Sequence, residues 1–188
     1  IKVAEGDYLL FFDADDLYEQ GDLLKEIAQA TPGADVVVFN WKEFQHGHDS
    51  KEYRPANYLP NMQTEYANGI CYLQEVTAMP LYPWYPWFYA FRREFWKEHD
   101  FQFPVGVKYE DVALIYKVLL AAKRITTVKD VWYCYRISRP GATTYALKYQ
   151  TEIDKLSSIG ENIHDVQARD LPQKLKKQLC NNFSCLYY

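Results

Sequence analysis

The sequence predicts an α/β fold with a helical extension at its C-terminal end, and two patterns lead to this prediction. Short apolar runs typical of buried strands alternate with segments whose apolar residues recur at helical spacing. Two further helical segments then follow one another without a strand between them. The predicted strands are residues 7–12, 34–41, 125–128 and 131–137, and the predicted helices are residues 18–30, 67–74, 109–123, 146–168 and 172–186.

Length, composition and charge restrict the classes of protein to which this chain can belong. The chain has 188 residues, of which 48% are apolar, and this is enough for one packed domain with an appendage. A formal net charge of -4 argues against nucleic acid as a partner, because no basic excess meets a phosphate backbone. No apolar run approaches the ~20 residues of a membrane span. The cysteines form no C-x-x-C pair, so a reducing, cytoplasmic setting is expected.

An acidic cluster directly follows the first predicted strand. Asp13, Asp15 and Asp16 lie within four residues of one another. Such crowding raises pKa values and costs stability unless a cation or a donor-rich ligand neutralises the charge. The cluster therefore indicates a divalent metal that bridges to phosphate, whereas the alternative is a set of acids capping the helix that follows. An EF-hand is excluded, because Leu17 and Tyr18 occupy a ligand position and the required glycine position.

A second acidic pair, Glu110 and Asp111, opens the most apolar helix of the sequence. Carboxylates at a helix N-terminus are stabilised by the helix dipole, so simple capping is one interpretation. The other is that a partly buried carboxylate with a raised pKa acts as a general base. Arg136 and Arg139, at the end of the last predicted strand, could either grip phosphate or be surface charge.

Histidines and cysteines receive ordinary structural interpretations. His46 and His48 lie in a polar loop without a third ligand nearby, which favours solvated side chains over a zinc site. Cys134 is expected to be a buried thiol in a strand, and Cys180 and Cys185 are expected to pack on an amphipathic helix.

Four sequence blocks in a fixed order resemble family 2 inverting glycosyltransferases, which have the GT-A fold. Residues 4–16 resemble the family's strand that ends in D-x-D-D, and residues 87–95 resemble the segment that begins at its central tryptophan. Residues 103–112 resemble the acceptor-side F-P-x-G-x-x-Y-E-D motif, and residues 133–142 resemble the Y-x-Y-R-x-R-x-G-S ending. The resemblance implies a partial GT-A fold over residues 1–145, a Rossmann-like mixed sheet with flanking helices, and a helical extension over residues 146–188.

The resemblance assigns the acidic turn to the donor side of the reaction. Asp15 would be the main ligand of Mg²⁺ or Mn²⁺ on the donor diphosphate, and Asp13 would help to fix the nucleotide sugar and the metal. Asp16 would face donor or acceptor. Arg136 and Arg139 would lie near the diphosphate.

The acceptor side is assigned in the same way. Asp111 matches the general base that deprotonates the acceptor hydroxyl, and Glu110 would support it or bind acceptor. Trp87 and Tyr109 would contact the acceptor, with Trp87 as a wall of the sugar pocket. The intact protein would then move a sugar from a nucleotide-sugar donor to a glycan, polysaccharide or lipid-linked acceptor, with a peripheral association at the inner face of the membrane as a further expectation. The resemblance leaves the oligomeric state open.

The sequence departs from the family in three ways. Phe88 and Tyr89 follow Trp87 where polar or basic residues are usual, and Ala142 replaces a serine. The family's V-S-V-I-I-P-x-Y-N strand and V-D-D-G-S turn, which hold the nucleotide, do not occur in this sequence. We therefore expect the chain to be the later part of a longer protein and, alone, to bind donor weakly and to be inactive.

Two other classes of function remain as alternatives. A non-catalytic module of the same origin would bind glycan or protein through its many aromatic residues. A metal-dependent phosphotransfer enzyme would also use acid clusters, but it would need a phosphate-cradling glycine loop, and the sequence shows none.

Overall fold

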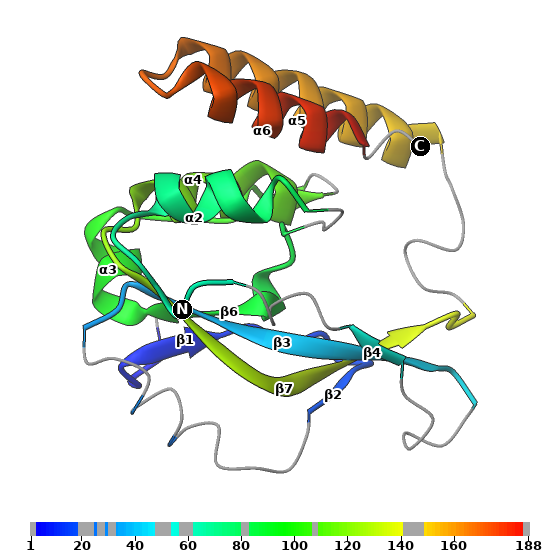
Figure 1. Cartoon of the computed structure of the whole chain (residues 1–188). Coiled ribbons are helices and arrows are strands. Elements are labelled where there is room, and N and C mark those ends of the chain that lie inside the picture. Colours follow the sequence, from blue (N-terminus) through cyan, green and yellow to red (C-terminus); the bar gives the residue numbers. More distant parts are fainter. Residues whose placement is uncertain are drawn as a thin grey trace.

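A mixed β-sheet lies under two successive layers of helices in the computed structural model (Figure 1). The structure describes residues 3–18, 25, 29, 33–47, 54–56, 62–79, 83–106, 109–140 and 149–185. For residues 54–56, 129–132 and 150–151 it describes the backbone alone.

Within the described residues the sheet has seven strands, five of which follow one path in the order β1-β6-β3-β7-β2. Strands β3 and β7 are parallel to each other, and every other pairing is antiparallel. Strand β4 adds to β3, and β5 adds to β7. The strands are β1 (Tyr8–Leu10), β2 (Leu17–Tyr18), β3 (Val36–Gln45), β4 (Arg54–Ala56), β5 (Glu65–Tyr66), β6 (Tyr89–Arg92) and β7 (Ile125–Ile137).

Strand β3 lies at the centre of the sheet, between β6 and β7, because its first residues are apolar on both faces. Val36, Val37, Val38 and Phe39 are all buried, as expected for a strand covered on both sides. The pairing of β3 with β7 shifts register around Asn40, where Phe39 faces Val128 but Asn40 faces Val131. Two predicted strands are therefore one long strand with an irregularity at residues 129–130.

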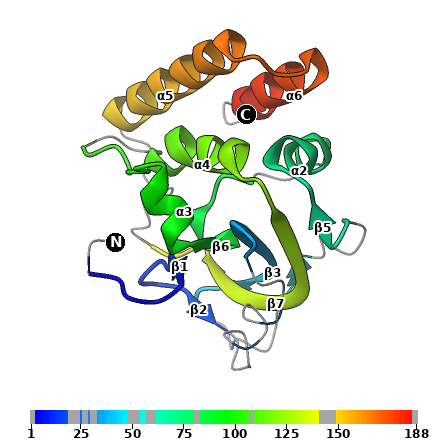
Figure 2. The ribbon, with the colours of Figure 1, turned by 90° about the vertical axis from the view of Figure 1, so that its left-hand side faces the viewer.

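Helices cover one face of this sheet and then each other. Helices α2 and α4 lie directly over the sheet, and α5 and α6 form a second layer on top of them (Figures 1 and 2). Trp84 joins the layers, since its Nε1 donates to Oδ1 of Asn182 on α6 at 2.8 Å. The helices are α2 (Gly69–Val76), the 3₁₀ turn η1 (Pro86–Phe88), α3 (Arg93–Glu98), α4 (Glu110–Ala121), α5 (Tyr149–Ala168) and α6 (Gln173–Ser184).

The close approach of α2 to α4 depends on a glycine. The backbone N–H of Gly69 donates to the carbonyl of Ala122 at 2.8 Å. A Cβ atom at this position would lie 1.6 Å from the carbonyl oxygen of Leu119, so any side chain would force the helices apart. Glycine is therefore required by packing here, although its backbone conformation is ordinary.

A buried ion pair ties the start of β3 to the end of β6. Arg92 donates to Asp35 Oδ1 through Nη2 at 2.7 Å and through Nε at 3.2 Å. The other carboxylate oxygen, Oδ2, accepts from the backbone N–H of Lys123 just after α4 at 2.8 Å. Both carboxylate oxygens of Asp35 therefore accept hydrogen bonds within the fold, and Arg92 compensates its charge where the sheet meets α4.

Most predicted elements are confirmed, with shifts at their ends. Strands at residues 7–12, 34–41 and 125–137 and helices at 67–74, 109–123, 146–168 and 172–186 all have counterparts. The helix predicted over residues 18–30 is wrong at its start, because Tyr18 belongs to β2. Of its remaining residues, only Lys25 and Gln29 are described, and both are helical.

Candidate functional site

The acidic cluster forms a tight turn between β1 and β2. The backbone N–H of Asp16 donates to the carbonyl of Asp13 at 3.2 Å, which closes the turn. Leu17 and Tyr18 then pair with β7 opposite Cys134 and Tyr133. Since a strand follows Asp16 directly, the alternative that Asp16 caps a helix is wrong.

Asp16 is held by two donors from β7. The Tyr133 hydroxyl donates to its Oδ2 at 2.5 Å, and the backbone N–H of Arg136 donates to its Oδ1 at 2.7 Å. Burial nevertheless raises the pKa of Asp16 to about 6, because loss of hydration and the neighbouring Asp15 and Asp13 outweigh the two hydrogen bonds. Asp16 is thus an anchor for the turn whose charge is only partly compensated.

A stack of aromatic rings supports that anchor. The ring of Tyr133 is fully buried and lies parallel to Trp87, with centroids 4.3 Å apart and an interplanar angle of 5°. Phe12, just before the acidic turn, stacks on Tyr133 at 5.9 Å. The tyrosine hydroxyl also accepts from the Asp13 N–H at 3.2 Å. The stack therefore fixes the position of both ends of the turn.

Trp87, which the sequence predicts to be a wall of the acceptor pocket, is packed into the core in this structure. Its side chain is 2% exposed, and its ring also lies near-parallel to those of Tyr85 and Tyr135. This packing places Trp87 against Tyr133, which holds Asp16. The acceptor role of Trp87 stays a prediction.

The two arginines meet the acidic turn. Nε of Arg136 donates to the Asp15 carbonyl at 2.6 Å, and its guanidinium lies over the ring of Phe44 at 4.6 Å. Nε of Arg139 forms an ion pair with Oδ2 of Asp15 at 2.8 Å. The structure thus brings together all three aspartates and both arginines that the sequence singled out, at the junction of β1, β2 and β7.

Asp111 lies in the first turn of α4, where helical N–H groups are unpaired. Its Oδ1 accepts from the N–H of Val112 at 2.8 Å. Burial raises the pKa of Asp111 to about 6, and the neighbouring Glu110 and Asp13 carboxylates add to that rise. This carboxylate is therefore poised to accept a proton near neutral pH.

Tyr109 precedes the helix in an unusual conformation. Its φ of 61° places it in the left-handed region, which non-glycine residues adopt at a cost. The ring of Tyr109 lies under Nζ of Lys155 from α5, 5.6 Å from the centroid. The strained backbone is thus held by a contact with the helical extension, and it sets where Glu110 and Asp111 begin.

The two acidic groups lie close enough to influence each other. Partial loss of hydration raises the pKa of Asp13, and Asp15 and then Glu110 raise it further. Asp13 in turn contributes to the raised pKa of Asp111. The two clusters are almost a hundred residues apart in sequence, and the fold brings them within electrostatic range of each other.

The donor set of the acidic turn fits a metal that is shared with a ligand. Among the residues that the structure describes, no three His, Cys, Asp or Glu side chains are arranged to hold a metal between them. Mg²⁺ commonly takes one or two carboxylates and completes its shell with water and substrate phosphate. Asp13 and Asp15 supply two carboxylates of this kind, which makes their chemistry compatible with such an ion.

The remaining sequence interpretations have mixed outcomes. Cys134 is buried as expected and Cys180 is half-buried, but Cys185 is exposed at the end of α6, so its predicted packing is wrong. The N–H of His46 extends the pairing of β3 to Ile137, while His48 lies outside the described residues. Within the described part of the chain, no helix combines the length and apolar character that crossing a membrane requires.

Comparisons with known proteins define the class. Residues 1–106 match the model of glycosyl transferase family 2, which is more than half of the chain, and the chain belongs to this family. The match includes the acidic turn and Trp87, and it ends before Glu110. Comparison with curated protein sequences gave no match.

The fold has a solved counterpart. The crystal structure of S. aureus TarS, residues 1–349, superimposes with a TM-score of 0.68 at 22% sequence identity. The alignment covers 97% of this chain and 47% of that chain, so this chain spans about half the length of the solved one. The predicted partial GT-A fold with C-terminal helices is thereby confirmed.

Two residues that matter to the geometry were not singled out from the sequence. Tyr133 was part of the Y-x-Y-R block, and that motif is the signal that could have identified it. Asn162 on α5 is 2% exposed and donates through Nδ2 to the carbonyl of Val112 at 3.0 Å. A single asparagine in a helix gives no signal of this kind, because its partner lies fifty residues earlier in the chain.

Proposed function

We propose that the intact protein transfers a sugar, with inversion, from a nucleotide-sugar donor to a hydroxyl of a glycan, polysaccharide or lipid-linked acceptor. Membership of glycosyl transferase family 2 supports sugar transfer in general. The observation that supports the finer proposal is the electrostatic coupling between two carboxylate groups, the Asp13–Asp16 turn and Glu110–Asp111. An inverting transfer needs a donor side and a base on opposite faces of one carbon.

Asp111 is proposed as the base. An acceptor oxygen forms a bond to the anomeric carbon while the bond from that carbon to the diphosphate oxygen breaks. The acceptor proton passes to the Asp111 carboxylate, and the nucleoside diphosphate leaves with the electron pair. A pKa of about 6 keeps this carboxylate mainly ionised at pH 7 while leaving it basic enough to take the proton.

Asp13 and Asp15 would hold Mn²⁺ or Mg²⁺, which when bound supplies positive charge beside the departing diphosphate. Arg136 and Arg139 carry fixed positive charge at the same turn, which suits a phosphate group. In the structure Arg139 neutralises Asp15. We infer that a donor diphosphate would bind Arg139 in place of Asp15, which would leave the Asp15 carboxylate available to the metal.

The non-catalytic alternative depends on an aromatic binding surface. Four of the five tryptophans have described side chains, and Trp41, Trp84, Trp87 and Trp96 are all buried in the core. These tryptophans pack in the core, so a non-catalytic module would have to bind through exposed rings such as those of Phe12, Tyr18 and Tyr149.

The decisive experiment compares Asp15→Asn and Asp111→Asn in the full-length protein, measuring release of nucleoside diphosphate from a panel of nucleotide sugars with Mn²⁺. Both variants are expected to fold and to lose transfer, and a chelator is expected to abolish wild-type turnover. Glu94→Gln, an exposed change on α3, is the control for charge. Near-normal turnover by either variant would contradict the proposed roles.

A further inference from the structure

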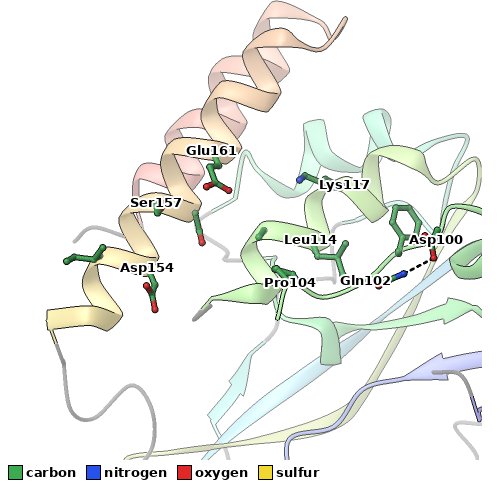
Figure 3. A pocket seen from close by; sticks show the side chains of 12 residues that line it. Asp100, Gln102, Pro104, Leu114, Lys117, Asp154, Ser157 and Glu161 are labelled. Atoms are coloured by element: carbon green, nitrogen blue, oxygen red, sulfur yellow. Dashed lines mark hydrogen bonds between the residues drawn. The ribbon is translucent and has the colours of Figure 1, made fainter. Parts of the chain in front are cut away.

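A cavity of about 480 Å³ lies between α4, α5 and the segment that leads into α4 (Figure 3). Its size is within the ~300–1,000 Å³ typical of small-molecule sites. The proposed chemistry does not use it, although Pro104 of its lining belongs to the 103–112 motif. Its lining combines carboxylates, hydroxyls and an amide with apolar side chains, and such a mixture suits a ligand with both hydroxyl groups and apolar faces.

Two helices line the cavity with matching rows of side chains. On α5 the row is Asp154, Ser157, Ser158 and Glu161, and the labelled members project toward α4 in Figure 3. These positions are spaced i, i+3, i+4 and i+7, so they occupy one helical face. The facing row on α4 is Ala113, Leu114 and Lys117.

The α4 row continues directly into the proposed acceptor side. Glu110 stands three and four residues before Ala113 and Leu114, and it therefore lies on the same helical face, one turn of about 5.4 Å away. Glu110 is exposed and close to Asp13 and Asp111. A chain whose end reaches Asp111 can therefore extend along this face into the cavity.

The most buried polar side chain in the cavity lining is that of Ser158, which is 7% exposed. Its hydroxyl can both donate and accept hydrogen bonds, so it offers a polar contact to a ligand that enters the cavity. The walls beside it are fixed, because Asn162 bonds α4 at one end and Lys155 covers Tyr109 at the other.

The charges around the cavity limit the class of ligand. Asp100, Asp154 and Glu161 supply three carboxylates against the single ammonium of Lys117. Asp100 already accepts a hydrogen bond from Gln102 at 2.9 Å. This balance disfavours phosphate groups, whereas carboxylate and amide oxygens readily accept hydrogen bonds from sugar hydroxyls. Pro104, Leu114 and Ile153 offer apolar surface for the ring face of a sugar.

We propose that this cavity is a subsite for a neutral sugar residue of the acceptor chain, bound beyond the residue that receives the transferred sugar. The inference rests on the proposed function for its role in catalysis. Binding itself requires neither donor nor turnover, so the two can be tested separately.

The test is an NMR titration of the ¹⁵N-labelled chain with neutral hexasaccharides of glucose and of N-acetylglucosamine, and with inorganic polyphosphate. Saturable shifts of the Ser158 and Glu161 amides with a neutral hexasaccharide are expected. Glu161→Gln should weaken this binding by roughly 3- to 10-fold, as loss of one hydrogen bond predicts. Ser158→Leu should fill the cavity and abolish the shifts, with Ser184→Leu on α6 as its matched control.

The exposed Glu161→Gln variant keeps the test valid if Ser158→Leu fails to fold. Absence of shifts with both neutral hexasaccharides, or stronger binding of polyphosphate, would overturn the subsite even in an active transferase. Saturable hexasaccharide binding together with unimpaired transfer by Asp111→Asn would instead support the subsite and overturn the proposed base.

Discussion

The hydroxyl of Tyr133 donates a hydrogen bond of 2.5 Å to the carboxylate of Asp16, although the two residues are 117 positions apart. The same hydroxyl accepts the N–H of Asp13. One buried tyrosine on β7 thus holds both ends of the acidic turn that follows β1. The geometry of the donor side depends on this contact.

Tyr133→Phe removes the hydroxyl and keeps the ring stack on Trp87. The free energy of unfolding should fall by about 1–3 kcal/mol, because Asp16 and the Asp13 N–H each lose a partner. The pKa of Asp16 should rise further above 6, since the hydrogen bond from Tyr133 lowers it. Urea unfolding and carboxyl NMR titration measure the two effects. Tyr135→Phe is the control, and an equal loss in both variants would refute the anchor role.

Asp111→Asn should stabilise the protein at pH 7 while removing the proposed base. The pKa of Asp111 is raised from 3.8 to about 6, so the folded state binds more protons than the unfolded state between these values. The free energy of unfolding of the wild type should therefore fall as pH rises from about 4 to about 6. The neutral variant should lose this part of the slope and be about 1–2 kcal/mol more stable at pH 7.

Asp165→Asn is the matched comparison, because its shift has the opposite sign. Burial acts to raise the pKa of Asp165, but hydrogen bonds from Arg169 and Tyr116 outweigh it and lower that pKa. The wild-type carboxylate therefore stabilises the fold above its unfolded pKa, and replacing it should cost about 0.5–1 kcal/mol at pH 7. Urea unfolding at several pH values checks both variants, and the same sign of change in both would be inconsistent with these assignments.

Arg139→Gln should separate metal binding from nucleotide binding. Without the 2.8 Å ion pair, Asp15 is free for a cation, so calorimetry should show tighter binding of Mn²⁺ alone by a few-fold. Nucleotide affinity in the presence of Mn²⁺ should fall, because one positive charge near the diphosphate is lost.

Arg169→Gln provides the control for Arg139→Gln. It removes the same charge from an ion pair of similar exposure, with Nε of Arg169 2.6 Å from Oδ2 of Asp165. This pair lies on α5, away from the acidic turn. Equal changes in Mn²⁺ affinity in the two variants would show that Arg139 acts only through overall charge.

Asn162→Ala should loosen the first turn of α4. The buried amide of Asn162 bonds the Val112 carbonyl, while the Val112 N–H bonds Asp111. We expect a loss of about 1–3 kcal/mol in the free energy of unfolding and faster amide exchange at Val112 and Ala113. Asn181→Ala, an exposed change on α6, should leave both unchanged. Unaltered exchange in Asn162→Ala would mean that α5 does not stabilise this turn.

Two glycine substitutions test the packing of α2 on α4. Gly69→Ala places a Cβ against the Leu119 carbonyl and should cost more than about 3 kcal/mol, because backbone must move. Gly160→Ala on α5 meets open space, and it should stabilise the chain by about 0.5–1 kcal/mol. Thermal unfolding of both variants is sufficient, and a Gly69→Ala protein as stable as the wild type would contradict the close approach.

The sequence by itself determined the fold class, the longer elements, the family and the identity of the acidic residues, but not the short elements β2, β4, β5, β6 and α3. Apolar runs such as residues 36–39 predict buried strands, and the near-continuous apolar character of residues 112–121 predicts a buried helix. These features are local, because the period of side chains along an element sets which positions can be buried. The prediction of two strands at residues 125–128 and 131–137 was wrong because local patterns do not show strand pairing. Only the pairing with β3 shows that β7 continues through residues 129 and 130.

Tertiary structure alone decided which of these residues work together. Asp111 is no different in sequence from any acid at a helix start, and its raised pKa arises from burial and from Asp13, which the fold brings near. Trp87 belongs to a family motif, but the sequence does not show that its ring stacks on Tyr133. The cavity beside Ser158 likewise exists only where two helices meet. The hydration of a side chain, its coupling to other charges and the shape of a cavity all depend on residues that are distant in sequence. Local sequence patterns therefore do not predict them.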